Sequence, residues 1–310
     1  MSANRPESAD RPVSVAARPD APRFGRVLIT GGQGQLGRAL ALAYADAEAV
    51  AALGRADLDV TDWQAVRASV AAFAPDLIVH AAAATDVDGC ESDITGTFRI
   101  NALGARNVAH AAAERDTPLV YLSTNYVFAG TKPPGAAYHE WDDTGPLSVY
   151  GHAKLAGEAE TRQLARQHYV VRTSQVYAAQ GRKFVQTMLR LAHEGRTTIG
   201  GVADQWGQPT YAVDLAIAIA ALARTGAWGT YHLTNAGSCS WAEWATEIFR
   251  LTGRDVAVEP IPAATFPRPA TPPANGVLHN WAAAALGITL PDWRDGLRRC
   301  LAEMGELRAA

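Results

Sequence analysis

The sequence contains little cysteine and no long apolar run. Among its 310 residues are three cysteines, Cys90, Cys239 and Cys300, which lie far apart and form no Cys-x-x-Cys pair. An odd number of scattered cysteines argues against a disulfide framework or a zinc site and favours a reducing cytoplasm. No apolar run reaches the roughly 20 residues that a membrane-spanning helix needs. We therefore expect a cytoplasmic protein with no membrane partner.

The sequence also lacks blocks of like charge. Its formal net charge is −3, which gives no reason to expect a nucleic-acid partner. No group of His, Asp and Glu has the spacing of a metal site, so we expect no metal. Residues 1–23 are rich in Pro, Arg, Ala and Ser and lack the apolar core of a secretory signal. We expect them to form a disordered tail.

From residue 24 to residue 171, short apolar runs alternate with longer amphipathic stretches. The runs are continuously apolar, which is typical of parallel strands covered on both faces. The pattern therefore predicts an α/β fold with a doubly wound parallel sheet. The expected strands are 26–30, 50–53, 76–80, 119–123 and 169–172, and the expected helices are 38–49, 63–73, 98–115 and 150–168.

The regular alternation ends after Arg172. We expect residues 172–207 and 236–310 to form a smaller, substrate-binding domain, while a segment of about 208–235 returns to the first domain. Helices are expected at 212–223 and 241–251. Five prolines within Pro262–Pro273 predict a loop.

Three glycines follow the first expected strand directly. Gly31, Gly34 and Gly37 form a G-x-x-G-x-x-G set between that strand and the next helix. In a dinucleotide-binding turn, such glycines permit the tight turn, the close approach of a pyrophosphate and close helix packing. The helix start, with Gln35 and Leu36, would offer free N–H groups to the anion. The turn predicts a Rossmann-type domain that binds a nicotinamide dinucleotide.

The second strand bears on which dinucleotide is bound. A carboxylate at its end would hold the ribose of NAD, but this strand ends at Leu53-Gly54-Arg55. Arg55 is suited to the 2′-phosphate of NADPH, so NADPH is favoured and NADH is the alternative. From their positions, Asp59 and Val60 are expected to flank the adenine.

Tyr150 and Lys154 stand four residues apart at the start of an expected helix, which places both on one face. A nearby ammonium is expected to lower the pKa of the tyrosine, which could then give its proton to a carbonyl oxygen. Thr124, at the end of an earlier strand, could hydrogen-bond the same oxygen. Asn101 is open to two interpretations, a water-mediated proton relay near Lys154 or a structural hydrogen bond.

The combination of these motifs resembles the dTDP-4-dehydrorhamnose reductase family of extended short-chain dehydrogenases. The resemblance covers about Arg26 to Leu301. It rests on segments 30–37, 80–88, 123–128, 146–158, 172–177, 204–210 and 290–293.

The resemblance implies hydride transfer from NAD(P)H to C4 of a dTDP-4-keto-6-deoxyhexose. It makes Tyr150 the proton donor, Lys154 the residue that orients the nicotinamide ribose, and Thr124 the residue that holds the keto oxygen. Ala81, Ala82 and Ala83 would line the cofactor, and Val87, Tyr126 and Trp206 would lie near the sugar nucleotide.

Three positions depart from the family pattern where the substrate should bind. Asn125 stands where Asp is usual, Gln175 where Trp is usual, and Thr271 lies in a segment that usually contains arginine. A different NDP-keto sugar, as used in antibiotic glycosylation, is therefore one alternative substrate.

Two further alternatives keep the fold but change the activity. One is a non-catalytic NADP-binding regulatory subunit, like that of methionine adenosyltransferase. The other is a nucleotide-sugar dehydratase or epimerase. Dehydration is disfavoured because Asn125 and Tyr126 replace the Asp-Glu pair of dehydratases. The expected assembly is a monomer or a homodimer.

Overall fold

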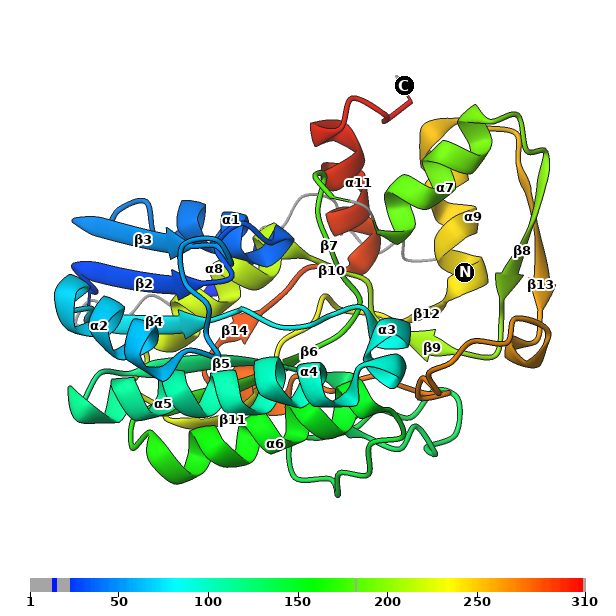
Figure 1. The fold of residues 1–310 in the computed structure, drawn as a ribbon. Helices are drawn as coiled ribbons and strands as arrows, with labels where there is room; N and C mark the ends of the chain where they lie inside the picture. Colours follow the sequence, from blue (N-terminus) through cyan, green and yellow to red (C-terminus); the bar gives the residue numbers. More distant parts are fainter. Residues whose placement is uncertain (1–12, 16–22, 182, 309–310) are drawn as a thin grey trace.

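The structure is a computed structural model that describes residues 13–15, 23–181 and 183–308 (Figure 1). The predicted disordered tail therefore lies largely outside the described residues. Its one described piece differs from the prediction, since β1 (Ser14–Val15) pairs antiparallel with β14 (Ile288–Thr289). None of the helices in these ranges is long and apolar enough to cross a membrane. The same ranges hold no group of three or more potential metal ligands.

A six-stranded parallel sheet forms the centre of the larger lobe. Its strand order is β11-β6-β5-β4-β2-β3. The chain passes from β2 to β3 on one side and then crosses to β4 on the other, so the strand order reverses between β2 and β4. Ligands bind at such a switch point in open α/β sheets. The strands are β2 (Arg26–Thr30), β3 (Ala49–Leu53), β4 (Leu77–His80), β5 (Leu119–Thr124), β6 (His168–Thr173) and β11 (Gly229–His232).

Both faces of this sheet are covered, as the continuous apolar strands predict. Side chains alternate along β2: Val27 and Ile29 join the core under α1 (Gln35–Ala43) and α8 (Ala212–Ala223), while Leu28 joins the opposite core. That second core lies under α2 (Trp63–Phe73) and α5 (Gly104–Glu114). Figure 1 shows α5 and α6 (Val149–Leu164) along one side of the sheet. The doubly wound fold class is confirmed.

A side-chain cap decides where α2 begins, whereas α1 begins without one. Asp62 caps α2 by accepting a hydrogen bond from the Ala65 N–H, and this helix has the predicted bounds. Helix α1 differs from the predicted 38–49, because it begins at Gln35, directly after Gly34, and ends at Ala43. The earlier start brings the first turn of α1 against the glycine-rich turn.

The predicted long helix 98–115 is broken into three pieces: α4 (Ile94–Phe98), the π-helical turn η1 (Arg99–Leu103) and α5. Asn101, in the π turn, accepts a hydrogen bond from the Ala84 N–H at 2.8 Å and donates one to the Ala84 carbonyl at 3.1 Å. The amide of Asn101 thus anchors the loop after β4, which is the structural one of its two expected roles.

The smaller lobe lies beside the carboxyl ends of the sheet strands (Figure 1). Trp244 and Trp293 are at most 2% exposed and lie in its core. Its helices are α7 (Phe184–His193), α9 (Trp241–Thr252) and α11 (Trp293–Glu303). Its strand pairs are β8 (Thr198–Val202) with β13 (Ala257–Ile261), β7 (Val176–Tyr177) with β10 (Thr210–Tyr211), and β9 (Trp206–Gly207) with β12 (Cys239–Ser240).

The chain returns to the larger lobe twice. Helix α8 packs on α1, and β11 extends the sheet beside β6. After the smaller lobe, α10 (Trp281–Ala285) and β14 follow, and Ala283, Ile288 and Leu290 join the core of α1 and α8. The second return departs from the expected division, which assigned all of residues 236–310 to the smaller domain.

Candidate active site

The glycine-rich turn lies at the switch point of the sheet. Gly31 has a φ of +70°, which favours glycine, and a Cβ there would lie 2.7 Å from the Ala82 nitrogen. A Cβ on Gly37 would lie 2.2 Å from the Gly31 carbonyl oxygen, so only glycine lets α1 pack this closely. The turn and the Ala81–Ala83 segment after β4 are thus held against each other, as a dinucleotide cradle requires.

The amino end of α1 fits a pyrophosphate. Gly34 is the N-cap, and no side chain caps the first turn. The N–H groups of Gln35 and Leu36 are among those that a helix start leaves without intrahelical partners, and the helix dipole adds positive potential there. The side-chain amide of Gln35 points elsewhere, since it donates to the Gln180 carbonyl at 2.9 Å. We therefore expect Gln35 to use its backbone towards the phosphates.

Two guanidinium groups flank the end of β3. Arg55 is exposed just after the strand, and Asp59 and Val60 follow it. Arg38, which the sequence analysis missed, donates from its side chain to the Gln33 carbonyl and side-chain oxygens at 3.1 and 3.2 Å. Gln33 in turn packs on Gly54. The sequence did contain a signal for Arg38, because this arginine directly follows Gly37, the last glycine of the dinucleotide-binding turn.

Thr124 is the last residue of β5 and is 5% exposed. Its hydroxyl accepts from the Tyr126 N–H at 3.2 Å and donates to the Asn125 side-chain oxygen at 3.3 Å. Thr124 also lowers the pKa of the Tyr150 phenol, which places the two side chains near each other. The end of β5 and the start of α6 therefore lie side by side at this point.

Close packing sets the position of Tyr150. It follows the N-cap Ser148 in α6. A Cβ on Gly151 would lie 2.4 Å from the Tyr126 carbonyl oxygen. Burial raises the pKa of the Tyr150 phenol to about 12, and the hydrogen bond with Thr124 offsets only part of that. Lys154 was expected to lower the pKa of Tyr150. In the structure the loss of water around the phenol dominates, and the pKa is raised. At neutral pH Tyr150 keeps its proton, which is the form that a proton donor needs.

Lys154 lies one helical turn after Tyr150 and is 3% exposed. Its ammonium sits over the Tyr121 ring, 4.2 Å from the ring centroid. Burial lowers the pKa of Lys154 to about 7, although the charge of Glu158 opposes this shift. The Tyr121 hydroxyl donates to the Lys154 carbonyl at 3.1 Å and so ties the helix to β5.

A buried ionic network continues along the same face of α6. Glu158 is fully buried, and its carboxylate accepts from Ser123 at 2.5 Å, from Arg172 at 2.9 Å and from Arg162 at 2.7 Å. Burial alone would raise the pKa of Glu158, but the bonds and charges of Arg172 and Arg162 outweigh it and lower the pKa. The network locks β5, α6 and β6 together directly behind Thr124 and Lys154.

Glu158→Gln is expected to lower the free energy of unfolding by about 3 kcal/mol, because it leaves buried arginine charge without its counter-ion. Because the pKa of Glu158 is depressed, this stabilisation exists at neutral pH and is lost as pH falls through the folded-state pKa. Urea unfolding at neutral and acidic pH measures the difference. Glu160→Gln is the control, since that carboxylate is partly exposed and 3.8 Å from Arg106. Equal midpoints for the two variants would contradict the expectation.

The expected substrate residues lie around the same strand ends. Asn125 is 5% exposed and donates from its side chain to the Gly276 carbonyl at 3.1 Å. The Tyr126 ring meets the Tyr150 ring edge to face, with centroids 5.5 Å apart. Val87 is the first residue of α3 (Val87–Ser92). The structure thus gathers Asn125 and Tyr126 beside Thr124 and Tyr150.

Gln175 and Trp206 come from the smaller lobe. Gln175 has a φ of +46°, which is strained for a residue with a side chain, and its side-chain oxygen is buried without a partner among the described residues. Trp206 lines a cavity of about 480 Å³ together with Glu243, Trp293 and Arg294. The structure places Gln175 directly after β6, whereas Trp206 faces a hollow of the smaller lobe.

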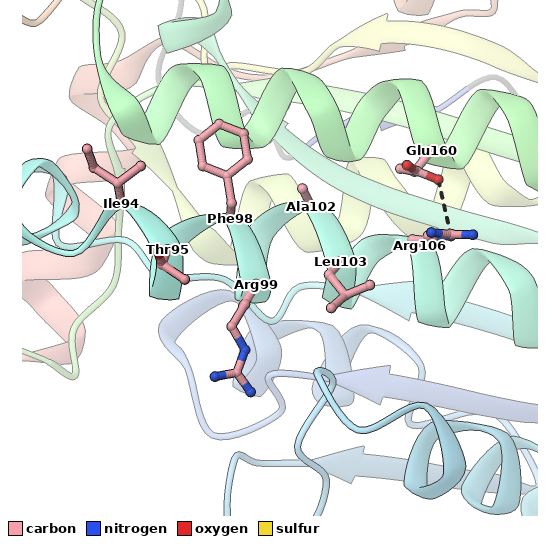
Figure 2. A pocket seen from close by; sticks show the side chains of 8 residues that line it. All are labelled: Ile94, Thr95, Phe98, Arg99, Ala102, Leu103, Arg106 and Glu160. Carbon is pink, nitrogen blue, oxygen red and sulfur yellow. Dashed lines mark ion pairs between the residues drawn. The ribbon is translucent and has the colours of Figure 1, made fainter.

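A second hollow lies on the outer face of α4, η1 and α5, next to α6 (Figure 2). Ile94, Phe98 and Leu103 expose 54%, 37% and 39% of their surface there. Arg106 and Glu160 form an ion pair at its end (Figure 2). This apolar face contains none of the groups of the Tyr150 site.

Comparison with known proteins agrees with this geometry. A family model described as the RmlD substrate binding domain matches residues 25–306. A dTDP-4-dehydrorhamnose reductase of Sinorhizobium fredii is 41% identical over 88% of this chain and 96% of its own length. The chain belongs to the dTDP-4-dehydrorhamnose reductase family.

A related reductase and a solved member of the dTDP-4-dehydrorhamnose reductase family have similar sequence identity to this chain. A dTDP-4-keto-6-deoxy-D-glucose reductase of Streptomyces niveus is 40% identical over 85% of this chain and 92% of its own. The solved dTDP-4-dehydrorhamnose reductase of Bacillus anthracis, in complex with NADP, is 39% identical and superposes with a TM-score of 0.86, covering 90% of this chain and 99% of its own. The family and the fold expected from the motifs are both confirmed.

Proposed function

We propose that this chain reduces the C4 keto group of a dTDP-4-keto-6-deoxyhexose with NADPH. The observation that carries the proposal is the meeting of Thr124, Tyr150 and Lys154 at the carboxyl edge of the sheet, beside the glycine-rich turn. The names of the relatives support the same reaction.

Tyr150 gives its proton to the keto oxygen. Because burial keeps the pKa of its phenol near 12, Tyr150 is protonated at neutral pH. Thr124 hydrogen-bonds the same oxygen and afterwards the phenolate that proton transfer leaves. The reaction needs both hydroxyls on one substrate oxygen, and the influence of Thr124 on the pKa of Tyr150 supports placing the two hydroxyls beside a common atom.

Lys154 stabilises that phenolate in its ammonium form and holds the nicotinamide ribose. The pKa of about 7 places its charge change near neutrality, which makes the charge sensitive to what binds beside it. An anionic phenolate one turn away favours the protonated amine.

The dinucleotide fits along the switch point. NADPH supplies the hydride when it is bound. The backbone N–H groups of Gln35 and Leu36 would hold its pyrophosphate, the turn at Gly31 and Gly34 would let it approach, and Ala81, Ala82 and Ala83 would lie along it. Asp59 and Val60 would lie near the adenine, and Arg55 would meet the 2′-phosphate, with Arg38 as a second candidate because it bonds Gln33, which packs on Gly54.

Arg55→Gln is expected to raise the KM for NADPH roughly 10-fold and to leave the KM for NADH unchanged, since only NADPH has the 2′-phosphate. Initial rates with each cofactor measure this. Arg67→Gln removes another exposed arginine, paired with Glu114 on the far side of α2, and serves as the control. A parallel change in both KM values would refute the role of Arg55.

The sugar nucleotide binds where the two lobes meet. Val87, Asn125 and Tyr126 surround it from the larger lobe and Gln175 from the smaller lobe. Trp206, which lines the separate hollow of the smaller lobe, is left out of this set. We expect a panel of dTDP-4-keto-6-deoxysugars to include at least one that consumes one NADPH per sugar reduced. The panel also distinguishes 4-dehydrorhamnose from other dTDP-4-keto sugars, since relatives at 41 and 40% identity are named dTDP-4-dehydrorhamnose reductase and dTDP-4-keto-6-deoxy-D-glucose reductase.

Other outcomes of the panel would overturn the proposal. Sugar conversion without net loss of NADPH indicates an epimerase. Tight NADP binding without any turnover indicates the non-catalytic subunit, which the retained Thr124, Tyr150 and Lys154 disfavour.

One further feature supports the cytoplasmic location of the protein, and another supports its assembly. Three buried free cysteines fit a cytoplasmic location. Of the two expected assemblies, the homodimer is supported by the apolar face of Ile94, Phe98 and Leu103 (Figure 2). Light scattering of the purified chain distinguishes it from the monomer by mass.

A further inference from the structure

The proline-rich segment 266–276, here called the strap, contacts both lobes beside Asn125. It lies beside α3 and β9, in orange in Figure 1. Its Ala270 N–H donates to Asp88 of α3 at 3.1 Å, its Gly276 carbonyl accepts from Asn125 at 3.1 Å, and its Ala274 carbonyl accepts from the Trp206 N–H at 2.8 Å. The strap therefore touches α3, the end of β5 and the smaller lobe at once.

The strap carries one guanidinium into this region. Arg268 donates from Nε to an Asp88 carboxylate oxygen at 2.9 Å, and the two side chains are 31% and 38% exposed. Within the described ranges, its two terminal nitrogens donate no hydrogen bond. Asp88 holds the Nε of the guanidinium, so the two terminal nitrogens remain available as donors.

Arg268 lies close to the catalytic group. Burial raises the pKa of Tyr126, while the charge of Arg268 lowers it. The Tyr126 ring in turn contacts the Tyr150 ring. The order from the phenol outward is thus Tyr150, Tyr126, Arg268. In a pyranose, C1 lies across the ring from C4, so a sugar whose C4 carbonyl meets Tyr150 directs its C1 substituent away from that phenol.

The nearby acids orient this cation and offset part of its charge. Asp88 is the carboxylate that holds Arg268, and its pKa is lowered by the hydrogen bond from Arg268, so the pair is ionised at neutral pH. Asp86 caps α3, where its side chain accepts from the Gly89 N–H at 3.2 Å. An orienting carboxylate behind an arginine is compatible with bidentate binding of an anion on its free edge.

We propose that Arg268, oriented by Asp88, binds the diphosphate of the nucleotide sugar. This inference rests on the proposed function and adds to it the residue that recognises the nucleotide part. Arg268 is a binding residue and takes no part in proton transfer.

Calorimetric titration with dTDP and with thymidine tests the assignment. Arg268→Gln is expected to weaken dTDP binding roughly 10- to 100-fold, because charge-assisted hydrogen bonds are lost, and to leave thymidine binding unchanged. The dTDP affinity of Arg268→Lys should lie between those of the wild type and Arg268→Gln, since an ammonium point charge replaces the planar guanidinium. Added salt should weaken dTDP binding by the wild type more steeply than by Arg268→Gln. Arg250→Gln is the control, because that arginine is exposed and paired with Glu247 on α9.

Steady-state kinetics separates this inference from the proposed function. With the keto sugar that the wild type reduces, Arg268→Gln should raise the KM for the sugar nucleotide and keep kcat and the KM for NADPH. A dTDP affinity within twofold of the wild type, or an equal loss for thymidine, overturns the assignment while leaving the reductase activity standing. A wild type that neither binds dTDP nor reduces any keto sugar overturns both.

Discussion

Tyr150→Phe is expected to lower kcat by about 100- to 10,000-fold, because it removes the proton that the keto oxygen must receive. The ring remains, so its edge-to-face contact with Tyr126 is kept, and the fold around α6 is undisturbed. The KM or Kd for NADPH should stay within a few fold, since the phenol hydroxyl is not needed to hold the dinucleotide. NADPH oxidation at saturating keto sugar measures the effect.

A matched Tyr→Phe change provides the control. The hydroxyl of Tyr231, on the edge strand β11, donates to the Ala227 carbonyl at 2.6 Å, away from the site. Tyr231→Phe should retain wild-type turnover. Near-normal turnover in Tyr150→Phe would remove Tyr150 from the proton-donor role, and with it the proposed mechanism.

Lys154→Met is expected to abolish most turnover and at the same time to stabilise the fold by about 2 kcal/mol at pH 7 or below, because it removes a buried ammonium. The direction of this stability change depends on how many protons the folded and unfolded states bind. The folded pKa of about 7 lies below the ordinary value of 10.5, so at low pH both states are protonated and the folded state has the full cost of burying charge. That cost disappears as pH rises from about 7 to about 10.5.

The stability gain should therefore shrink between pH 7 and pH 10.5, which denaturant unfolding at several pH values measures. Lys183→Met replaces an exposed lysine just before α7 and should show neither effect. A variant that is destabilised at every pH would show that the Lys154 ammonium is well compensated by Tyr121 and Glu158, contrary to its lowered pKa.

The pH dependence of the wild-type reduction follows from the same group. Because Lys154 is charged below a pKa of about 7, and Tyr150 keeps its proton up to about 12, kcat should fall as pH rises through the Lys154 pKa. In the absence of substrate, that pKa is set by burial. A bound anionic partner raises that pKa. The fall in kcat, which reports the loaded enzyme, should therefore lie at higher pH than the fall in kcat/KM, which reports the free enzyme.

Local signals were enough to predict much of the fold and of the catalytic group. Helix α2 has its predicted bounds because its cap, Asp62, lies next to it in the chain. The continuous apolar strands predicted a sheet with two covered faces. The i,i+4 spacing placed Tyr150 and Lys154 on one side of α6, since helical geometry needs only four residues to do so.

Groupings of residues far apart in the chain could not be predicted in this way. Arg268 meets Asp88 across 180 residues, and Glu158 meets Arg172 across a helix and a strand. The break of the long helix at η1 depends on where the loop after β4 passes Asn101. Residues 283–290 return to the larger lobe because a complete core under α1 and α8 exists only once all its segments are in place.

The sequence by itself therefore determined the fold class, the family and the order of the motifs, and it predicted the reacting residues, because capping, periodicity and the glycine turn act within a few residues. The tertiary structure alone decided how those residues ionise. Lys154 was expected to acidify Tyr150, yet burial raises the pKa of Tyr150 and lowers that of Lys154. Desolvation depends on every segment that covers a group, and no local pattern contains that information.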